Sequence, residues 1–260
     1  MSEMKNAVGA GTGRSGDDLC AGNSVREFKI WADVLNYGKK ILKNAGIVEA
    51  DLDAWYLFEQ SFGISRAQYF LCARENIVGS TAQKMTAQEQ TGNSLESKNA
   101  LDCVELWLKE KLSAYENALK KRAARIPLQQ IIGQQEFMGL SFFVNEHVLI
   151  PRQDTETLVE CVLSYVQPQM KVLDMCTGSG CILISLMKLG KIAQAVGADI
   201  SDEALKTAKK NAEKHQVEPL LIKSDLFENV ADKYDVIVSN PPYIRTAVIE
   251  ELKEEVRCHD

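Results

Sequence analysis

The chain has 260 residues, of which 45% are hydrophobic and 25% are charged. This ordinary globular composition excludes a collagen-like chain, a wholly disordered chain and a disulfide-stapled miniprotein, and the length suggests two domains. The formal net charge is −6 at pH 7. Proteins that grip nucleic-acid backbone usually carry a positive field, so we expect no stable nucleic-acid binding, although a local basic patch is compatible with this charge.

We expect no membrane partner, because no apolar run reaches the ~18 residues that a spanning helix needs. The polar, glycine-rich residues 1–24 lack the apolar segment of a secretory signal and are predicted to form a disordered tail. The seven cysteines form no C-x-x-C pair, and no histidine has zinc-site spacing, so we predict no metal. Their odd number and apolar neighbours favour reduced, buried thiols and a cytoplasmic protein.

Residues 25–126 carry apolar side chains at helical spacing and are predicted to form an N-terminal all-α helical domain. Trp31 and Leu35 mark a first helix. A second helix begins at Asp51 and is expected to end at Gly63, a typical residue after a helix C-terminus.

Residues 79–99 are polar and predict a loop or a weak helix, and a long amphipathic helix follows over 101–125. Basic side chains fill its last turn. They suit the negative end of the helix dipole, which is the interpretation we favour, or alternatively an acidic or RNA-associated partner. The inward stripe of this helix comprises Leu101, Val104, Leu108, Leu112, Tyr115 and Leu119.

Residues 127–148 predict a β-hairpin linker with Gly139 in its turn. From 149 to 260, strands alternate with helices, which predicts an α/β fold: a Rossmann-like parallel sheet of about four strands with right-handed crossovers. The strands are expected at residues 170–175, 194–199, 220–222 and 234–239, with helices over 181–189 and after an N-cap at Ser201.

A glycine-containing loop follows the first of these strands, where ligands bind in open α/β sheets. Gly178 and Gly180 let the backbone approach a ligand closely, and Asp199 ends the next strand, where a carboxylate can accept both ribose hydroxyls. A nicotinamide dinucleotide is disfavoured, because its fingerprint needs a glycine where this chain has Leu183, and no Walker lysine is present. The pattern therefore predicts an adenosine-containing cofactor.

The sequence Asn240-Pro241-Pro242-Tyr243 directly follows the fourth strand. The prolines fix their own φ and hold Asn240 extended. Asn240 Oδ1 and the Pro241 carbonyl can then accept two hydrogen bonds from one planar –NH₂ group, and Tyr243 can stack on that group. Two acceptors favour a pyramidal nitrogen and aim its lone pair, so this loop is suited to attack by an amide or aromatic amine.

These two loops together resemble those of class I S-adenosylmethionine-dependent amino-methyltransferases. A more specific resemblance comes from residues 136–140 (Glu-Phe-Met-Gly-Leu) and 149–156 (Leu-Ile-Pro-Arg-Gln-Asp-Thr-Glu). With Ser-Asp-Leu-Phe at 224–227 and the segment 237–244, they resemble the release-factor glutamine methyltransferases, the PrmC/HemK family. The resemblance covers residue 25 to the end of the chain.

The resemblance implies methyl transfer from S-adenosylmethionine to the side-chain N5 of the glutamine in the Gly-Gly-Gln motif of peptide chain release factors. It implies a helical domain for substrate recognition and a methyltransferase domain over residues 149–260. The glutamine amide would lie against Asn240, Pro241, Pro242 and Tyr243, with Asn240, Pro241 and Tyr243 catalytic. The cofactor would be bound by Asp174, Cys176, Thr177, Gly178, Ser179, Gly180, Asp199, Asp225, Leu226 and Asn240.

The chain departs from the family pattern in three places. Cys176 stands where the family usually has glycine, and Gln153 where it often has proline. The family's sheet continues for three more strands, whereas 17 residues follow Tyr243 here. If the strand order is 3-2-1-4, Val236, Ile237 and Val238 would form an exposed apolar edge. The expectation is a truncated copy with weak or no activity alone.

Two alternatives remain open from the residues. Adenine N6 presents the same planar –NH₂ group, so a nucleic-acid base N-methyltransferase would use the same loop. An inactive truncated adaptor that binds the translation machinery through its helical domain is the third possibility. The acidic charge, the helical domain and the hairpin favour the protein substrate.

Overall fold

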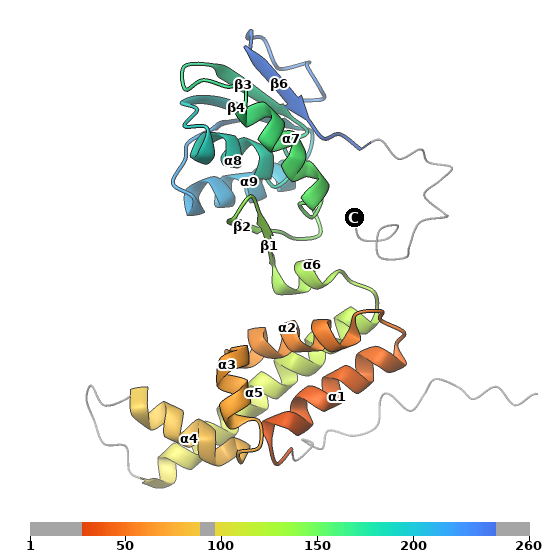
Figure 1. Ribbon diagram of the computed structural model, residues 1–260, viewed down its shortest axis with the longest axis vertical. Coiled ribbons are helices and arrows are strands. Elements are labelled where there is room, and N and C mark those ends of the chain that lie inside the picture. The colour runs from red at the N-terminus through yellow and green to blue at the C-terminus, as the bar shows by residue number, and fades with distance from the viewer. Residues whose placement is uncertain (1–27, 89–96, 243–260) are drawn as a thin grey trace, which may run out of the picture.

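The computed structural model describes residues 28–88 and 97–242 (Figure 1). Our predictions for the tail 1–24 and for Tyr243 therefore fall outside the described residues. Figure 1 shows a helical part and an α/β part, with one short helix and a β-hairpin between them. In the part of the chain that the structure describes, no helix is both long and apolar enough to cross a membrane.

The helical part is organised around a cluster of aromatic rings. Trp31 packs edge-on against Phe62 with ring centroids 5.1 Å apart, and Phe62 lies 5.6 Å from Tyr115. Gly38 makes room for this packing, because a Cβ there would lie 1.9 Å from the Tyr115 hydroxyl. Its helices are α1 (Trp31–Asn44), α2 (Ala50–Phe62), α3 (Arg66–Cys72), α4 (Ile77–Gln88) and α5 (Ser97–Ala123).

Three sequence predictions for this part can be compared with the structure. Helix α2 ends at Gly63 with φ 65°, as predicted. For the polar stretch 79–99, predicted as a loop or a weak helix, the helix is confirmed at its start: α4 occupies residues 77–88 and is held by a hydrogen bond from Trp31 Nε1 to Ser80 Oγ (3.1 Å). Leu101 is not in the core, because the residue is 50% exposed. It lies near the N-terminal end of α5, where α4 is the neighbouring helix.

The linker contains one unpredicted element, the short helix α6 (Leu128–Ile132), which is too brief to have an apolar period. The predicted hairpin is confirmed: β1 (Gln134–Phe137) pairs antiparallel with β2 (Leu140–Phe143). Met138 and Gly139 form its two-residue turn with φ values of 52° and 71°, as a type I′ turn requires.

The sheet of the α/β part has four parallel strands in the order β5-β4-β3-β6, which confirms the predicted fold class. Side chains alternate between its faces: Val172 joins a core with helices α7, α8 and α9, and Leu173 belongs to a smaller cluster on the other face. The elements are α7 (Gln153–Leu163), β3 (Lys171–Met175), α8 (Cys181–Leu189), β4 (Gln194–Asp199), α9 (Asp202–Lys214), β5 (Leu220–Lys223) and β6 (Val236–Ser239).

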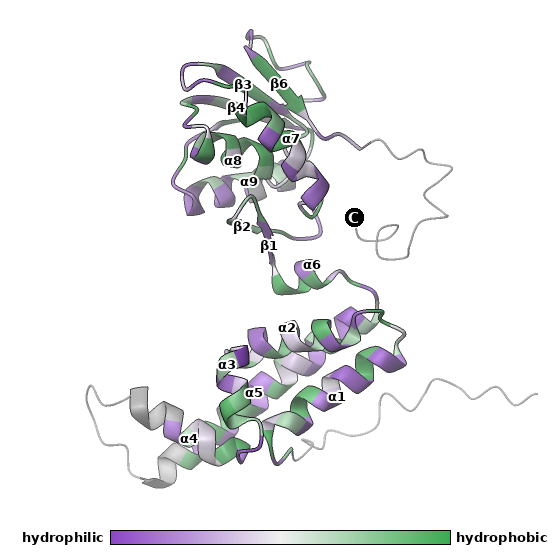
Figure 2. Cartoon of the chain, viewed as in Figure 1, coloured by the Kyte–Doolittle hydropathy of each residue, from purple (hydrophilic) through white to green (hydrophobic). Residues whose placement is uncertain are grey.

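Strand β6 is hydrophobic along its length (Figure 2) and, among the described residues, pairs with β3 alone. Ile237 is 54% exposed, as expected for an apolar edge, but Val238 is buried in the core that α7 and α8 form. Two cysteines also differ from expectation: Cys103 and Cys161 are exposed, because they lie on outward faces of α5 and α7.

Two acidic residues of α2 give a matched test of what holds the helical part together. Asp53 accepts a hydrogen bond from Arg122 Nε at 2.7 Å, and both side chains are buried. Asp51 pairs with Lys43 at 2.8 Å in solvent. Removing one partner of a buried ion pair leaves the other charge, here that of Arg122, buried without its carboxylate. Asp53→Ala is therefore expected to lower the free energy of unfolding by about 3–5 kcal/mol.

Asp51→Ala is expected to leave the unfolding midpoint nearly unchanged, since exposed pairs contribute little. Urea denaturation of both variants measures the contrast. Equal losses of stability in the two variants would contradict it.

Candidate active site

The parallel register places three predicted site segments at one edge of the sheet. Met175 of β3 is paired with Ala198 of β4 on one side and with Ser239 of β6 on the other. The next residues along the chain, Cys176, Asp199 at the end of β4, and Asn240, therefore lie at the same edge of the sheet. Ser239 Oγ also donates a hydrogen bond to the Met175 carbonyl (2.7 Å), which fixes the end of β6 against β3.

The glycine loop is tightly anchored and leaves open space above one residue. The Thr177 N–H donates to the Ala198 carbonyl (3.0 Å), and the Gly180 N–H donates to the Thr177 carbonyl (2.8 Å). Gly178 has φ 54° and no atom within 4 Å of a Cβ built on it, whereas a Cβ on Gly180 would lie 3.0 Å from Ile184. Gly178 thus leaves room for a ligand, and Gly180 permits close packing against α8.

Cys176 adopts φ 62°, a left-handed conformation that favours glycine. This is one of the positions at which the sequence departs from the family pattern. Burial and the nearby charge of Asp199 raise the pKa of the Cys176 thiol, although a hydrogen bond with Ser239 opposes this. The thiol is therefore neutral at physiological pH and adds no charge to the loop.

Asp199 is oriented by two backbone groups. Its Oδ2 accepts from the Gly178 N–H and its Oδ1 from the Ser201 N–H, each at 2.9 Å. A carboxylate oxygen has two lone pairs, so both oxygens can accept one more hydrogen bond. The arrangement holds the acid beside the open space over Gly178, where it can accept the two hydroxyls of a ribose.

Asp174 is fully buried beneath the loop and accepts a hydrogen bond from Thr177 Oγ1 (2.7 Å). Burial raises the pKa of Asp174 to about 7, and the charge of Asp199 adds to this effect. The hydrogen bonds from Thr177 and from the Leu183 backbone act in the opposite direction but do not prevail. The two acids repel one another, so a cation bound at this loop would relieve their repulsion.

Asn240 follows β6 and is half-buried. Its Nδ2 donates to Thr155 Oγ1 of α7 at 3.3 Å, a contact between residues that lie 85 positions apart. Pro241 and Pro242 are exposed, and Tyr243 lies beyond the described residues. Sequence reasoning missed Thr155, although it belongs to the segment 149–156 that carried the family resemblance.

Asp225 and Leu226 do not join the glycine loop. They follow β5, where the Ser224 N–H donates to the Asp199 carbonyl (3.0 Å), so they lie on the far side of Asp199. Both are exposed, and Leu226 has φ 45°. Among the described residues, no hydrogen bond connects either side chain to the loop.

Asn211 of α9 is a fully buried amide that the sequence analysis overlooked. It accepts from the Phe143 N–H (2.6 Å) and donates to the Phe143 carbonyl (3.0 Å), as a neighbouring strand would. It also donates to the Ser179 carbonyl at 2.8 Å, which connects the hairpin to the glycine loop. The signal was present: Asn211 lies on the inward stripe of α9 with Ala204, Ala208 and Ala212.

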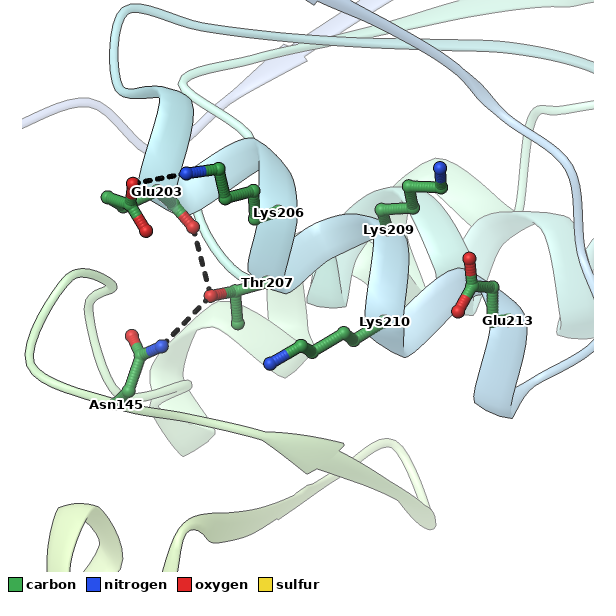
Figure 3. Close-up of a pocket in the computed structure, with 7 residues that line it drawn as sticks. All are labelled: Asn145, Glu203, Lys206, Thr207, Lys209, Lys210 and Glu213. Carbon is green, nitrogen blue, oxygen red and sulfur yellow. Dashed lines mark hydrogen bonds and ion pairs between the residues drawn. The ribbon is translucent and has the colours of Figure 1, made fainter.

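A shallow pocket elsewhere on α9 contains none of the predicted site residues (Figure 3). Asn145 Nδ2 donates to Thr207 Oγ1, and Thr207 in turn donates to the Glu203 carbonyl. These bonds fasten the segment after the hairpin to α9. The pocket is lined by Asn145, Glu203, Lys206, Thr207, Lys209, Lys210 and Glu213.

Two family models match the chain. The model described as "PrmC N-terminal domain" matches residues 33–88, and the one described as "Methyltransferase small domain" matches residues 152–255. The first lies in the helical part. The second spans the glycine loop, Asp199 and Asn240.

Many curated relatives are named release factor glutamine methyltransferase. The one from Geobacter sulfurreducens is 48% identical over 152 residues, covering 58% of this chain and 54% of the relative. The one from Agrobacterium fabrum is 39% identical and covers 55% and 52%, so the chain spans about half the length of several curated relatives. The one from Caulobacter vibrioides is 32% identical over 227 residues, covering 85% of this chain and 68% of the relative.

This last alignment extends across the helical part, the hairpin and the α/β part together. The two family models match the helical part and the α/β part separately, at residues 33–88 and 152–255. The resemblance in the sequence is thereby confirmed, and the chain belongs to the release factor glutamine methyltransferase family.

Proposed function

We propose that the chain transfers a methyl group from S-adenosylmethionine to the side-chain N5 of the glutamine in the Gly-Gly-Gln motif of peptide chain release factors. The observation that carries the proposal is the β3 register, which sets Asn240 on one side of the glycine loop and Asp199 on the other. No feature of the described residues favours methylation of a nucleic-acid base or a non-catalytic adaptor over this reaction.

The methyltransferase domain makes S-adenosylmethionine the cofactor, and the residues at the loop fit it. The open space over Gly178 accommodates a ligand, Asp199 offers acceptors for the ribose hydroxyls, and Asp174 places a second acid under the loop. The cofactor carries sulfonium and ammonium charges, which suit a site where two acids repel. When bound, it supplies an electrophilic methyl group.

Asn240 and Pro241 would orient the glutamine amide. Asn240 Oδ1 and the Pro241 carbonyl would accept hydrogen bonds from its two N–H groups, which would favour a more pyramidal nitrogen and fix the direction of its lone pair. Fixed acceptors require no strong general base before attack. Tyr243 would stack on the planar amide, and Pro242 would hold the loop rigid.

We also propose a division of labour along the chain. Residues 25–126 serve as the domain that recognises the release factor, residues 127–148 as the hairpin linker, and residues 149–260 as part of the methyltransferase domain. Asp225 and Leu226 would lie near the adenine. The reaction belongs to the translation machinery, which fits a cytoplasmic protein.

The direct test is to incubate the full chain with methyl-labelled cofactor and a release factor. The expected product is a peptide containing the Gly-Gly-Gln motif that is heavier by one methylene, measured by mass spectrometry. A release factor with that glutamine replaced by alanine is the control. Label found only in added RNA or DNA would overturn the proposal in favour of a base methyltransferase.

Asn240→Ala is expected to lower turnover at least ~100-fold, because an oriented acceptor for the reacting amide is lost. The cofactor Kd, measured by calorimetry, should be largely kept. Gln169→Ala, which removes an exposed amide just before β3 and so at the opposite end of the sheet, is the control and should keep full turnover. Unchanged turnover in Asn240→Ala would remove Asn240 from the mechanism.

Asp199→Ala is expected to weaken cofactor binding about 10- to 100-fold, since hydrogen bonds from a charged acceptor are the strong ones. Asp202→Ala serves as the matched control three residues away, because Asp202 is exposed and paired with Lys223. Calorimetry on both variants measures the difference. Equal affinities for the cofactor would disprove a ribose role for Asp199.

The raised pKa of Asp174 predicts that the stability of the folded protein depends on pH, and it fixes the sign of that dependence. An unfolded chain releases this proton near pH 3.8 and the folded protein near pH 7, so the ligand-free protein loses stability as pH rises between these values. Asp174→Asn should therefore raise the unfolding temperature at pH 8 and change it little at pH 4.

The same substitution should weaken cofactor binding at pH 8, where wild-type Asp174 is charged, and much less at pH 5.5. Thermal unfolding and calorimetry at these pH values give both readouts. An effect on unfolding that is identical at pH 4 and pH 8 would show that Asp174 does not titrate in this range.

A further inference from the structure

We infer that Thr155 is a positioning residue for Asn240: its hydroxyl holds the Asn240 side-chain amide by the nitrogen, so that the oxygen faces away from α7 and is available to the substrate. The inference rests on the proposed function and adds a residue to its mechanism. The starting observation is the hydrogen bond from Asn240 Nδ2 to Thr155 Oγ1 (3.3 Å).

The geometry of a primary amide gives this contact its consequence. The oxygen and nitrogen of the Asn240 side chain lie on opposite sides of the same carbon, so a nitrogen held by Thr155 turns Oδ1 away from α7. The proposed substrate group is itself an –NH₂ and needs acceptors. A rotated Asn240 would place donor against donor, which would misorient the reacting nitrogen.

Asn240 has little else to fix its side chain. The hydrogen bond of Ser239 to the Met175 carbonyl anchors the backbone just before it, and Pro241 restricts the backbone after it. Neither of these restraints is a hydrogen bond to the side-chain amide. Within residues 28–88 and 97–242, the Thr155 hydroxyl supplies the one hydrogen bond that the structure shows for this amide.

Thr155 is itself held by the first turn of α7. Its backbone N–H donates to the Arg152 carbonyl (3.0 Å), and the neighbouring Glu156 accepts from the Met138 N–H in the hairpin turn at 2.6 Å. The first turn of α7 is therefore held at its start by the bond to Arg152 and at its side by the bond to the hairpin. A hydroxyl on such a support can impose an orientation on the loop after β6.

The experiment compares Thr155→Val, which keeps the shape and removes the hydroxyl, with Thr155→Ser, which keeps the hydroxyl. One neutral hydrogen bond changes the population of a held side-chain position about 5- to 10-fold, so turnover on a release factor should fall by that factor in Thr155→Val. The cofactor Kd should stay within about twofold, and Thr155→Ser should retain most of the turnover.

A second readout does not depend on activity. The side-chain amide protons of Asn240, identified by their loss in Asn240→Asp, are followed by NMR in the ligand-free chain. Their exchange with solvent should be slow in the wild type and in Thr155→Ser, and faster in Thr155→Val. Ser164→Ala removes a hydroxyl at the far end of α7, where it bonds the Cys161 carbonyl, and should alter neither readout.

Turnover of Thr155→Val within about twofold of wild type would overturn the inference. So would equal damage in Thr155→Ser, or a loss of cofactor affinity that matches the loss of turnover. If the wild-type chain methylates no release factor, the proposed function fails, and the NMR comparison still decides whether Thr155 orients Asn240. Thr155→Ala replaces Thr155→Val if the valine variant does not fold.

Discussion

The parallel pairing of β3 with a strand on each side is the constraint on which the site depends. Met175 is opposite Ala198 and Ser239 at once, so three chain segments that are far apart in sequence emerge at one edge. Each of the three contributes a different chemical group: a glycine loop, a carboxylate and an amide. A shift of one residue in either pairing would turn the following side chains to the opposite face of the sheet.

The sequence predicted those parts of the site whose residues are neighbours in the chain. The glycine loop, the N-cap Ser201 and the asparagine–diproline segment are local patterns with local physical reasons, and so is the hairpin turn at Gly139. It did not predict Thr155 against Asn240 or Asn211 against Phe143, because those contacts join residues 85 and 68 positions apart. The exposure of Leu101 was missed for a related reason, since tertiary packing decides it.

The site is not built for stability. Asp174 is buried with a raised pKa, and Cys176 holds a backbone conformation in which most side chains are strained. The surrounding structure offsets these costs: the strands, α8 and α9 pack a continuous core under the loop. Such local conflicts concentrate where a ligand is received, because the groups are arranged for the bound state rather than for the empty one.

Asn211 links two segments of the chain, the hairpin and the glycine loop. Its side-chain amide completes the hydrogen bonding of Phe143 in β2 and also donates to the Ser179 carbonyl. The same side chain therefore holds both the hairpin and the glycine loop. Thermodynamic linkage is reciprocal. A restraint on the position of either segment therefore also acts on the other through the Asn211 side chain.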